Sequence, residues 1–442
     1  MFDPRLIFSF CLASFLLIGC ATTDGPATSS RPSVDQRLPT PTPPTSQPIP
    51  EPASSPVPVI TLPHMQGRAV VRLALLLPFS ASNEALRDQA QSMLNAAQLA
   101  VLESNDLRLV LLPKDTRGSE IGAGEAARSA LRDGADIIIG PLLSRAVLGA
   151  ARAVSNRQIP MIAFSTDRNV AGNGVYLMSF QPEVEVARII NYAANNELTS
   201  FALLRGQTAY GQRVEQALYQ HAAANGAHVT AVETYARDTR TMNAPAARIA
   251  QNENRQAALV AWRAAGGFGD PALDPNFVFD LPFAAVLLPE SGIRLQSLAP
   301  LLPFYDVDPR KTRFLGTGLW LDESLTREPA LRGGWFPGPD PQSMNEFTTS
   351  YEQAFSHKPQ RLAALAYDAV RVAGTIAQTD HDNQIQVRID QLEDARGFTG
   401  ATGLFRFDGT GLVEHMLAVY EMRRGQFVVI DPAPSEFAPV GF

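Results

Sequence analysis

The chain has 442 residues, 45% of them hydrophobic, which is enough for one or two domains that each bury a core. Its formal charge of -7 at pH 7 argues against a nucleic-acid-binding surface, which needs clustered lysine and arginine. Of the two cysteines, Cys11 lies in a segment that we expect to be removed, so no pair of thiols remains for a disulfide.

An apolar segment near the start of the chain ends in a cysteine. Residues 6–18 are almost wholly apolar, follow Arg5 and are too few to span a bilayer, which is typical of a secretory signal peptide. The string Leu17-Ile18-Gly19-Cys20 resembles the bacterial lipobox, whose cysteine receives a lipid and becomes the first residue of the mature chain. The resemblance implies a signal peptide over 1–20 and a membrane anchor on Cys20. An ordinary signal peptide with an unrelated cysteine is the alternative.

The segment after Cys20 indicates which membrane anchors the protein and how far the folded part can lie from that membrane. Ala21 is not the aspartate that typically retains enterobacterial lipoproteins at the inner membrane, so the analogy favours the outer membrane of a Gram-negative bacterium, facing the periplasm. Residues 21–65 are rich in proline, serine and threonine and bury too little apolar area to offset their ordering entropy. As an extended tether at about 3.1 Å per residue, they reach on the order of 100 Å. The tether is a plain spacer or carries a proline-rich docking motif.

Strands and helices alternate from residue 66 onward. The strands predicted first are 70–77, 107–112, 136–140 and 160–164. The helices between them are predicted at 83–103, 120–132 and 142–155. This alternation indicates a parallel, doubly wound sheet, in which ligands bind at the carboxyl ends of the strands.

A second array follows the first and predicts a second α/β lobe. Its predicted strands are 200–204, 228–234 and 283–288, and its predicted helices are 210–224 and 246–256; a later helix is predicted at 361–377. Residues 266–282 show no periodicity and predict an irregular insertion. Short apolar runs with glycine turns at 403–409, 417–422 and 427–430 predict antiparallel strands near the end of the chain.

Candidate binding residues follow the predicted strands. Those of the first array are Phe79, Ser80, Pro141, Leu142, Ser165 and Thr166. The hydroxyls of Ser165 and Thr166, with free backbone N–H groups, suit a carboxylate or a sugar-like hydroxyl, although an N-cap or turn uses the same residue types. Tyr210 follows the first strand of the second array, where it closes over a ligand or packs on its own helix.

The sequence lacks the usual signatures of catalysis and metal binding. Its six histidines show no zinc-ligand spacing, and neither a Gly-x-Ser-x-Gly elbow nor a GxxxxGK[ST] loop occurs. Gly122-Ala123-Gly124 matches part of the dinucleotide fingerprint, but it lies too far after a strand, which favours ordinary helix packing. We therefore predict a protein that is not an enzyme and has no catalytic residue, metal or cofactor.

Residues 68–431 resemble the type I periplasmic binding proteins of the leucine/isoleucine/valine-binding kind. The motifs that carry the resemblance are Leu75-Leu76-Leu77-Pro78-Phe79, Ile139-Gly140-Pro141, Pro160-Met161-Ile162-Ala163-Phe164-Ser165, Ala209-Tyr210-Gly211, Leu365-Ala366-Tyr367-Asp368 and Gly403-Leu404-Phe405-Arg406-Phe407. The resemblance implies an α/β fold of two doubly wound lobes, with an interlobe cleft and three hinge crossings. The expected lobes within 66–442 are 66–180 with 341–385, and 181–340 with 386–435.

Three further strings are similar to the penicillin-binding-protein activator lipoproteins. They are Leu298-Ala299-Pro300-Leu301-Leu302-Pro303-Phe304-Tyr305, Leu315-Gly316-Thr317-Gly318-Leu319-Trp320 and Gly333-Gly334-Trp335-Phe336. This resemblance implies an outer-membrane activator of peptidoglycan synthesis whose partner is a peptidoglycan synthase. The helical-repeat domain that precedes this fold in the enterobacterial activators is not expected here.

The alternative is a lipid-anchored substrate-binding protein of a branched-chain amino-acid ABC importer. In amino-acid-binding members of the superfamily, Ser/Thr groups hold the ligand carboxylate and an acidic side chain holds the ammonium group. Ser165, Thr166 and Tyr210 occupy matching places, Glu290 is the candidate acid, and Thr317 completes the candidate set. Without such an acid the ammonium would stay unpaired and bind poorly. The expected ligand is an amino acid or a cell-wall fragment.

Overall fold

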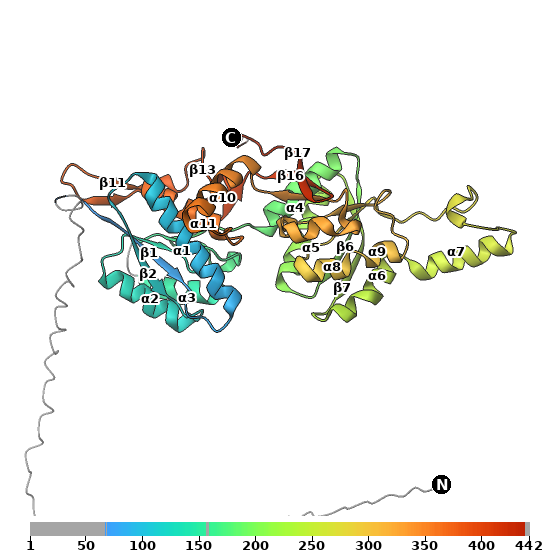
Figure 1. The fold of residues 1–442 in the computed structure, drawn as a ribbon, viewed down its shortest axis with the longest axis horizontal. Coiled ribbons are helices and arrows are strands. Elements are labelled where there is room, and N and C mark those ends of the chain that lie inside the picture. Colours follow the sequence, from blue (N-terminus) through green and yellow to red (C-terminus); the bar gives the residue numbers. More distant parts are fainter. Residues whose placement is uncertain (1–66, 68, 156–158, 438–442) are drawn as a thin grey trace, which may run out of the picture. The chain divides into compact units, whose positions relative to one another are not determined.

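The computed structural model describes residues 67, 69–155 and 159–437 of the chain. The predicted signal peptide, Cys20 and the proline-rich tether lie outside these residues. Two open β-sheets organise the described part, and helices cover both faces of each sheet (Figure 1). None of the described helices is long and apolar enough to cross a membrane.

The first sheet has five parallel strands in the order β2-β1-β3-β4-β5. The strands are β1 (Val71–Leu77), β2 (Leu109–Asp115), β3 (Ile137–Ile139), β4 (Met161–Ala163) and β5 (Val175–Leu177). The helices around it are α1 (Glu84–Ser104), α2 (Glu120–Arg132), α3 (Ser144–Val154), α10 (Pro341–Phe355) and α11 (Ala363–Ile376). The four predicted strands are confirmed, whereas β5 was not predicted.

Helices on both faces explain why β1 is apolar almost throughout. Leu73 and Leu75 share a core with residues of α1 and α11, and Ala74 and Leu76 share another with residues of α2 and α3. Successive side chains of a strand point to opposite faces, so a strand covered on both sides needs apolar residues at every position. Figure 1 shows α1 and α11 on one side of the strands and α2 and α3 on the other.

The second sheet has seven strands in the order β17-β16-β10-β9-β8-β6-β7. They are β6 (Ser200–Gly206), β7 (His228–Tyr235), β8 (Ala285–Leu287), β9 (Arg313–Leu315), β10 (Trp335–Gly338), β16 (Ala418–Arg423) and β17 (Gln426–Asp431). The helices are α4 (Pro182–Asn195), α5 (Ala209–Ala224), α6 (Asn243–Ile249), α7 (Asn252–Ala264), α8 (Gly292–Leu298) and α9 (Leu301–Phe304). The first five strands of this sheet in chain order run parallel, and β16 and β17 are antiparallel, as predicted.

The chain passes between the two sheets after β5, after β10 and after β15. After α11, the short strands β11 (Ala377–Thr379), β12 (Ile385–Val387), β13 (Phe398–Gly400), β14 (Gly403–Phe407) and β15 (Val413–His415) form two small antiparallel sheets. Phe405, Phe407 and Val413 lie in the core of the first sheet, and Leu412 bridges to Leu177 of β5. The expectation that 386–435 belongs wholly with the second lobe is therefore wrong, since only β16 and β17 join the second sheet. The sequence of β13, β14 and β15 shows only that alternate residues are buried. It does not show whether they are buried in the core of the first sheet or in that of the second.

One buried histidine lies at this last crossing. His415 ends β15 and is 4% exposed. Its ring lies beside Phe180 and Phe405, at centroid distances of 5.2 and 5.5 Å. The Nε2 atom has no hydrogen-bond partner among the described residues. Burial lowers the pKa of His415 to about 3, so the ring is neutral at physiological pH.

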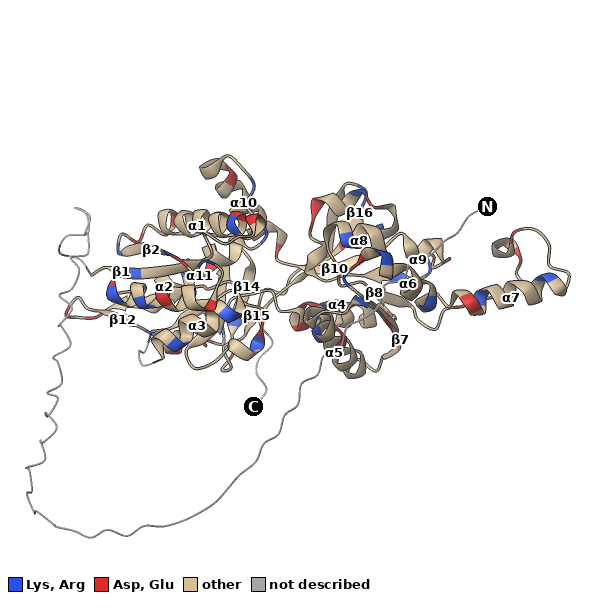
Figure 2. Ribbon diagram, turned by 90° about the horizontal axis from the view of Figure 1, so that it is seen from below, with Lys and Arg blue, Asp and Glu red and all other residues tan. Residues whose placement is uncertain are grey.

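A protruding segment replaces the single helix predicted at 246–256. The helix is divided into α6 and α7 at Gln251, whose φ of 51° is left-handed. We call residues 252–282 the arm: it contains α7, whose only buried residue is Trp262, and an irregular return with one short turn at Pro271–Leu273. Figure 2 shows charged residues of α7 near its two ends and uncharged ones between. The predicted irregular insertion forms the return of this arm.

Candidate functional site

Loops at the carboxyl ends of the first sheet hold the candidate residues of the first array. Ser80 follows β1, and both its backbone N–H and its hydroxyl donate to the carboxylate of Asp115 at the end of β2. Pro141 is buried, and its carbonyl oxygen accepts from the backbone N–H of Phe164 at 2.9 Å. Phe79 and Leu142 are partly buried and pack against the core of the first sheet. Of these four residues, only Ser80 is exposed at the sheet edge.

Gly140 sets the backbone path at the end of β3. Its φ of +94° lies in the left-handed region, and a Cβ there would collide with the carbonyl oxygen of Leu76 in β1. Glycine is therefore required at this position, which brings the loop at Pro141 close against the sheet.

Ser165 and Thr166 differ in their surroundings although they are adjacent. Ser165 is 4% exposed; its hydroxyl oxygen accepts from the backbone N–H of Asp167 at 3.1 Å, and its carbonyl oxygen accepts from the Ser179 hydroxyl at 2.9 Å. The Ser165 hydroxyl therefore takes part in a local turn, which is the alternative that the sequence analysis gave to a contact with a ligand. Thr166 is exposed, and its carbonyl oxygen accepts a hydrogen bond from Arg213 of α5.

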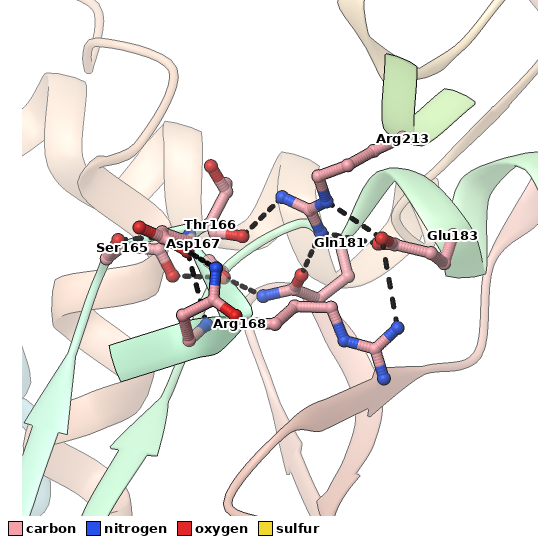
Figure 3. A network of polar contacts seen from close by, with 9 residues as sticks. Ser165, Thr166, Asp167, Arg168, Gln181, Glu183 and Arg213 are labelled. Atoms are coloured by element: carbon pink, nitrogen blue, oxygen red, sulfur yellow. Dashed lines mark hydrogen bonds and ion pairs between the residues drawn. The ribbon is translucent and has the colours of Figure 1, made fainter. Parts of the chain in front are cut away.

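Arg213 joins α5 to this loop, as Figure 3 shows. Its Nε and Nη2 atoms donate to the two carboxylate oxygens of Glu183 at 2.8 and 2.5 Å, and Nη2 also donates to Gln181 Oε1 at 2.8 Å. Arg168 adds a looser ion pair to Glu183, at 3.8 Å. The network therefore links the loop after β4, the first chain crossing and the start of α5. The sequence did not single out Arg213, because an arginine on a helix face carries no distinguishing pattern.

Tyr210 and Thr317 come together at the edge of the second sheet. The Tyr210 hydroxyl and the Thr317 hydroxyl lie 2.9 Å apart, and Thr317 is fully buried. Burial raises the pKa of Tyr210, and the nearby charge of Glu185 acts in the same direction. Tyr210 also packs partly against the core shared by α4 and α5. Tyr210 therefore packs against this core, and its closing over a ligand stays a prediction.

Glu185, which the sequence did not single out, is buried beside this pair. Its carboxylate accepts a hydrogen bond from the backbone N–H of Gly318, and a Cβ on Gly318 would collide with it. Burial raises the pKa of Glu185 to about 7, although the charge of Arg361 acts the other way. No sequence signal marked this residue, since acidic residues are common in the first turn of a helix.

Glu290 follows β8 and lies beside Gly206 at the end of β6. It is therefore at the carboxyl ends of the strands of the second sheet, where the sequence predicted it. Its carboxylate accepts hydrogen bonds from the Tyr235 hydroxyl at 3.0 Å and from Arg294 Nε and Nη2 at 3.0 and 3.1 Å. The guanidinium of Arg294 also lies over the Tyr235 ring, 5.7 Å from its centroid. Glu290 is thus an internally paired acid, with a partner one helical turn along α8.

Taken together, three groups of side chains line the carboxyl ends of the strands. Thr166 contacts Arg213, Tyr210 contacts Thr317, and Glu290 contacts Tyr235 and Arg294. Most of these side chains are already paired with each other, and Thr166 is the residue among them that is exposed. Among the described residues, no cluster of histidine, cysteine, aspartate or glutamate could hold a metal ion.

Comparisons with known proteins bear on this arrangement. Residues 70–269 match the family model described as periplasmic binding protein. No curated protein matches the chain. A putative branched-chain amino acid ABC transporter protein from Rhodospirillum rubrum is similar in structure, with a TM-score of 0.66 and 17% identity over 82% of this chain and 100% of the other.

Two further solved structures carry ligands. A branched-chain amino acid transporter substrate-binding protein from Streptococcus pneumoniae, in complex with isoleucine, has a TM-score of 0.56 and 18% identity over 82% of this chain and 100% of the other. A solute-binding protein of an ABC transporter from R. palustris, in complex with benzoate, has a TM-score of 0.56. Its identity is 16% over 83% of this chain and 98% of the other. The fold is therefore the type I periplasmic binding protein fold, as the resemblance implied.

Proposed function

We propose that the protein is a non-enzymatic solute-binding protein of the cell envelope, which holds a small ligand at the carboxyl ends of its two sheets and serves an ABC importer. Open α/β sheets bind ligands at those ends. The solved structures of the same fold are named as transporter proteins, and two of them hold small molecules. The predicted lipid on Cys20 would keep such a receptor at a membrane of the envelope.

The contact between Arg213 and the Thr166 carbonyl oxygen carries the proposal. Thr166 belongs to the loop after β4 of the first sheet, and Arg213 belongs to the helix after β6 of the second sheet. The loops that end the strands of both sheets therefore meet at this point. A small molecule placed there can receive hydrogen bonds from both sheets at once, which is how a two-lobed binding protein holds a solute.

Ligand-induced stabilisation tests the proposal. The full-length protein, purified in detergent, would be melted with a panel of amino acids, organic acids and muropeptides. A ligand present at a hundred times its Kd should stabilise the fold by about 2.7 kcal/mol. Arg168→Gln should weaken the effect, because Arg168 lies in the segment after β4 and pairs with Glu183 in the Arg213 network, and Arg310→Gln should leave it unchanged, because exposed Arg310 pairs with Asp308 before β9. A panel without any shift would contradict the proposed function.

A second candidate function is the activation of a peptidoglycan synthase, and the arm favours it. The arm exposes large apolar side chains: Phe268 is 97% exposed, Leu273 82%, and Val260 and Val278 69% each. Several large apolar side chains exposed on one segment are typical of a protein-binding surface, and binding a solute does not require them. The similarity of three strings to the activator lipoproteins points to the same partner.

Capture of a purified class A peptidoglycan synthase separates the two functions. Phe268→Asp should abolish capture if the arm is the contact, whereas Arg168→Gln should not change it. Because Phe268 is almost fully exposed, its replacement leaves the fold intact. Failure of the unmodified protein to capture the synthase would eliminate this second candidate.

A further inference from the structure

A cavity of about 850 Å³ lies at the base of the arm. Ser200, Ala284 and Thr312 line it, and these residues stand at the amino-terminal ends of the parallel strands β6, β8 and β9. The cavity is therefore at the opposite edge of the second sheet from the carboxyl ends of its strands. Its volume falls within the range of about 300–1,000 Å³ that is usual for binding cavities.

One wall of this cavity is an extended segment of the arm that pairs with no strand. Residues 277–281 line the cavity, and burial alternates from 277 to 283: the odd-numbered residues are partly or fully buried, and the even-numbered ones are exposed. Such alternation is typical of a β-strand, and phenylalanine and valine favour strands. However, from Val278 to Phe283 no backbone N–H or C=O has a hydrogen-bond partner among the described residues.

The segment is held in place through its side chains. The guanidinium of Arg255 in α7 lies over the rings of Phe277 and Phe279, 5.9 and 6.0 Å from their centroids. Its Nε atom is also 2.9 Å from the carboxylate of Asp306 on the opposite wall, although without hydrogen-bond geometry. Arg255 thus connects the two walls, and the backbone of the segment stays unpaired between them.

The opposite wall offers places for apolar side chains. Pro303 and Tyr305 line it, and both are partly exposed. The Tyr305 hydroxyl donates to Asn243 Oδ1 at 2.6 Å, which fixes the orientation of the ring. A strand that enters the cavity can therefore place alternate side chains against Tyr305 on one wall and Phe279 on the other.

Asp280 is the single charged residue in 277–281, and it is exposed. It has no ion pair or side-chain hydrogen bond within the part of the chain that the structure describes. Opposite charges on neighbouring strands stabilise their pairing, so the fitting partner carries a lysine or arginine at this point. Pro282 limits the pairing on one side, because it has no N–H group to donate.

We propose that this cavity binds an extended, basic peptide segment of a partner protein, which adds as a β-strand to residues 277–281. Unpaired backbone groups of an extended segment are a template for pairing with another chain. In strand addition, backbone hydrogen bonds supply the affinity and pockets for alternate side chains supply the selectivity. The site lies at the other edge of the sheet from the proposed solute site and does not depend on it.

Selection from a library of random twelve-residue peptides tests the proposal. The full-length protein in detergent would be immobilised, and detergent-coated beads would remove non-specific binders first. We expect the recovered peptides to alternate apolar residues, to contain lysine or arginine, and to lack proline within the alternating stretch. Recovery of no peptide, or of proline-rich peptides only, would overturn the proposal.

Methylation of single backbone nitrogens in a recovered peptide tests the pairing itself. Alternate N–H groups of an added strand face the protein, so methylation at those positions should weaken binding at least tenfold, and methylation between them less than threefold. Bound peptide should also slow hydrogen exchange of the amides at 278–281 at least tenfold. Equal effects of methylation at every position, or slowed exchange only elsewhere, would contradict strand addition here.

Charge exchange assigns the site to Asp280. Asp280→Lys should weaken binding of the basic peptide at least tenfold, and replacing the basic residue of the peptide with glutamate should restore it. Glu253→Lys is the matched control, because it makes the same change of charge on α7 of the same arm and should leave binding unchanged. Circular dichroism melting shows whether both variants keep the fold.

The outcomes separate this site from the solute site. A basic peptide that binds Asp280→Lys as tightly as the unmodified protein would overturn the proposed placement. Asp280→Lys should not alter stabilisation by a solute, so failure of the peptide site leaves the proposed solute-binding function standing.

Discussion

Replacing His415 with leucine should remove an acid-sensitive element from the fold. The ring is 4% exposed beside Phe180 and Phe405, and Nε2 has no hydrogen-bond partner among the described residues. Protonation would place an uncompensated charge in this apolar surrounding, which is why burial lowers the pKa of His415 to about 3.

The shift in pKa converts into a dependence of stability on pH. The unfolded chain binds a proton at His415 with a pKa of about 6.5, whereas the folded chain binds it only near pH 3. The unfolded state is therefore favoured as the pH falls below 6.5, and the effect grows by about 1.4 kcal/mol per pH unit until pH 3. Between pH 8 and pH 5 the loss from this residue amounts to about 2 kcal/mol.

Urea unfolding at pH 8 and pH 5 measures this loss. The unmodified protein should lose about 2 kcal/mol more than His415→Leu between the two pH values. All other titrating groups, including Glu185 and Asp368 with raised pKa values, are common to both proteins and cancel in the comparison. His381→Leu is the matched control, because His381 is exposed and should behave like the unmodified protein.

An equal loss in the unmodified protein and in His415→Leu, with equal slopes in urea, would refute the reasoning. It would mean that the His415 ring reaches water or a proton acceptor in the folded state. A loss that also disappears in His381→Leu would point to titration in the unfolded chain instead.

Three further substitutions test buried groups by urea unfolding. Glu185→Gln should remove a loss of about 2 kcal/mol that the unmodified protein suffers between pH 5 and pH 7.5, because a carboxyl whose folded pKa is about 7 loses its stabilising protonated form over that range. Asp368→Ala should cost at least about 3 kcal/mol at pH 7, because it leaves two backbone N–H groups and one hydroxyl without an acceptor. The exposed Asp382→Ala should cost less than about 0.5 kcal/mol, and an equal cost for both would contradict this account. Trp320→Ala should cost about 3–5 kcal/mol because the ring is fully buried, whereas Phe268→Ala should change little.

Elements with a strong apolar period were predictable from the sequence. The helix predicted at 120–132 has the bounds of α2, and the strand predicted at 70–77 differs from β1 by one residue. The division between α6 and α7 was missed, because helical propensity continues through Gln251 and only its left-handed backbone interrupts the helix. Helix α4 was not predicted either, although Pro182 stands at its start.

The candidate site shows where a single sequence reaches its limit. Topology places Ser165, Tyr210 and Glu290 at strand ends, because each follows an apolar strand. Whether a side chain there is free or already paired depends on residues far along the chain, as for Thr166 and Arg213, or on the rotamer of a neighbour, as for Glu290 and Arg294. Periodicity and spacing carry no information on either.

The three crossings of the chain also govern the order in which the molecule can fold. One core of the first sheet, on the face covered by α1 and α11, includes Phe407, and one core of the second sheet includes Tyr420 and Met422. These two cores cannot be completed until almost the whole chain has emerged from the ribosome. If the predicted signal peptide directs the chain across the inner membrane, the late completion of these two cores would help to keep the chain unfolded until it has crossed.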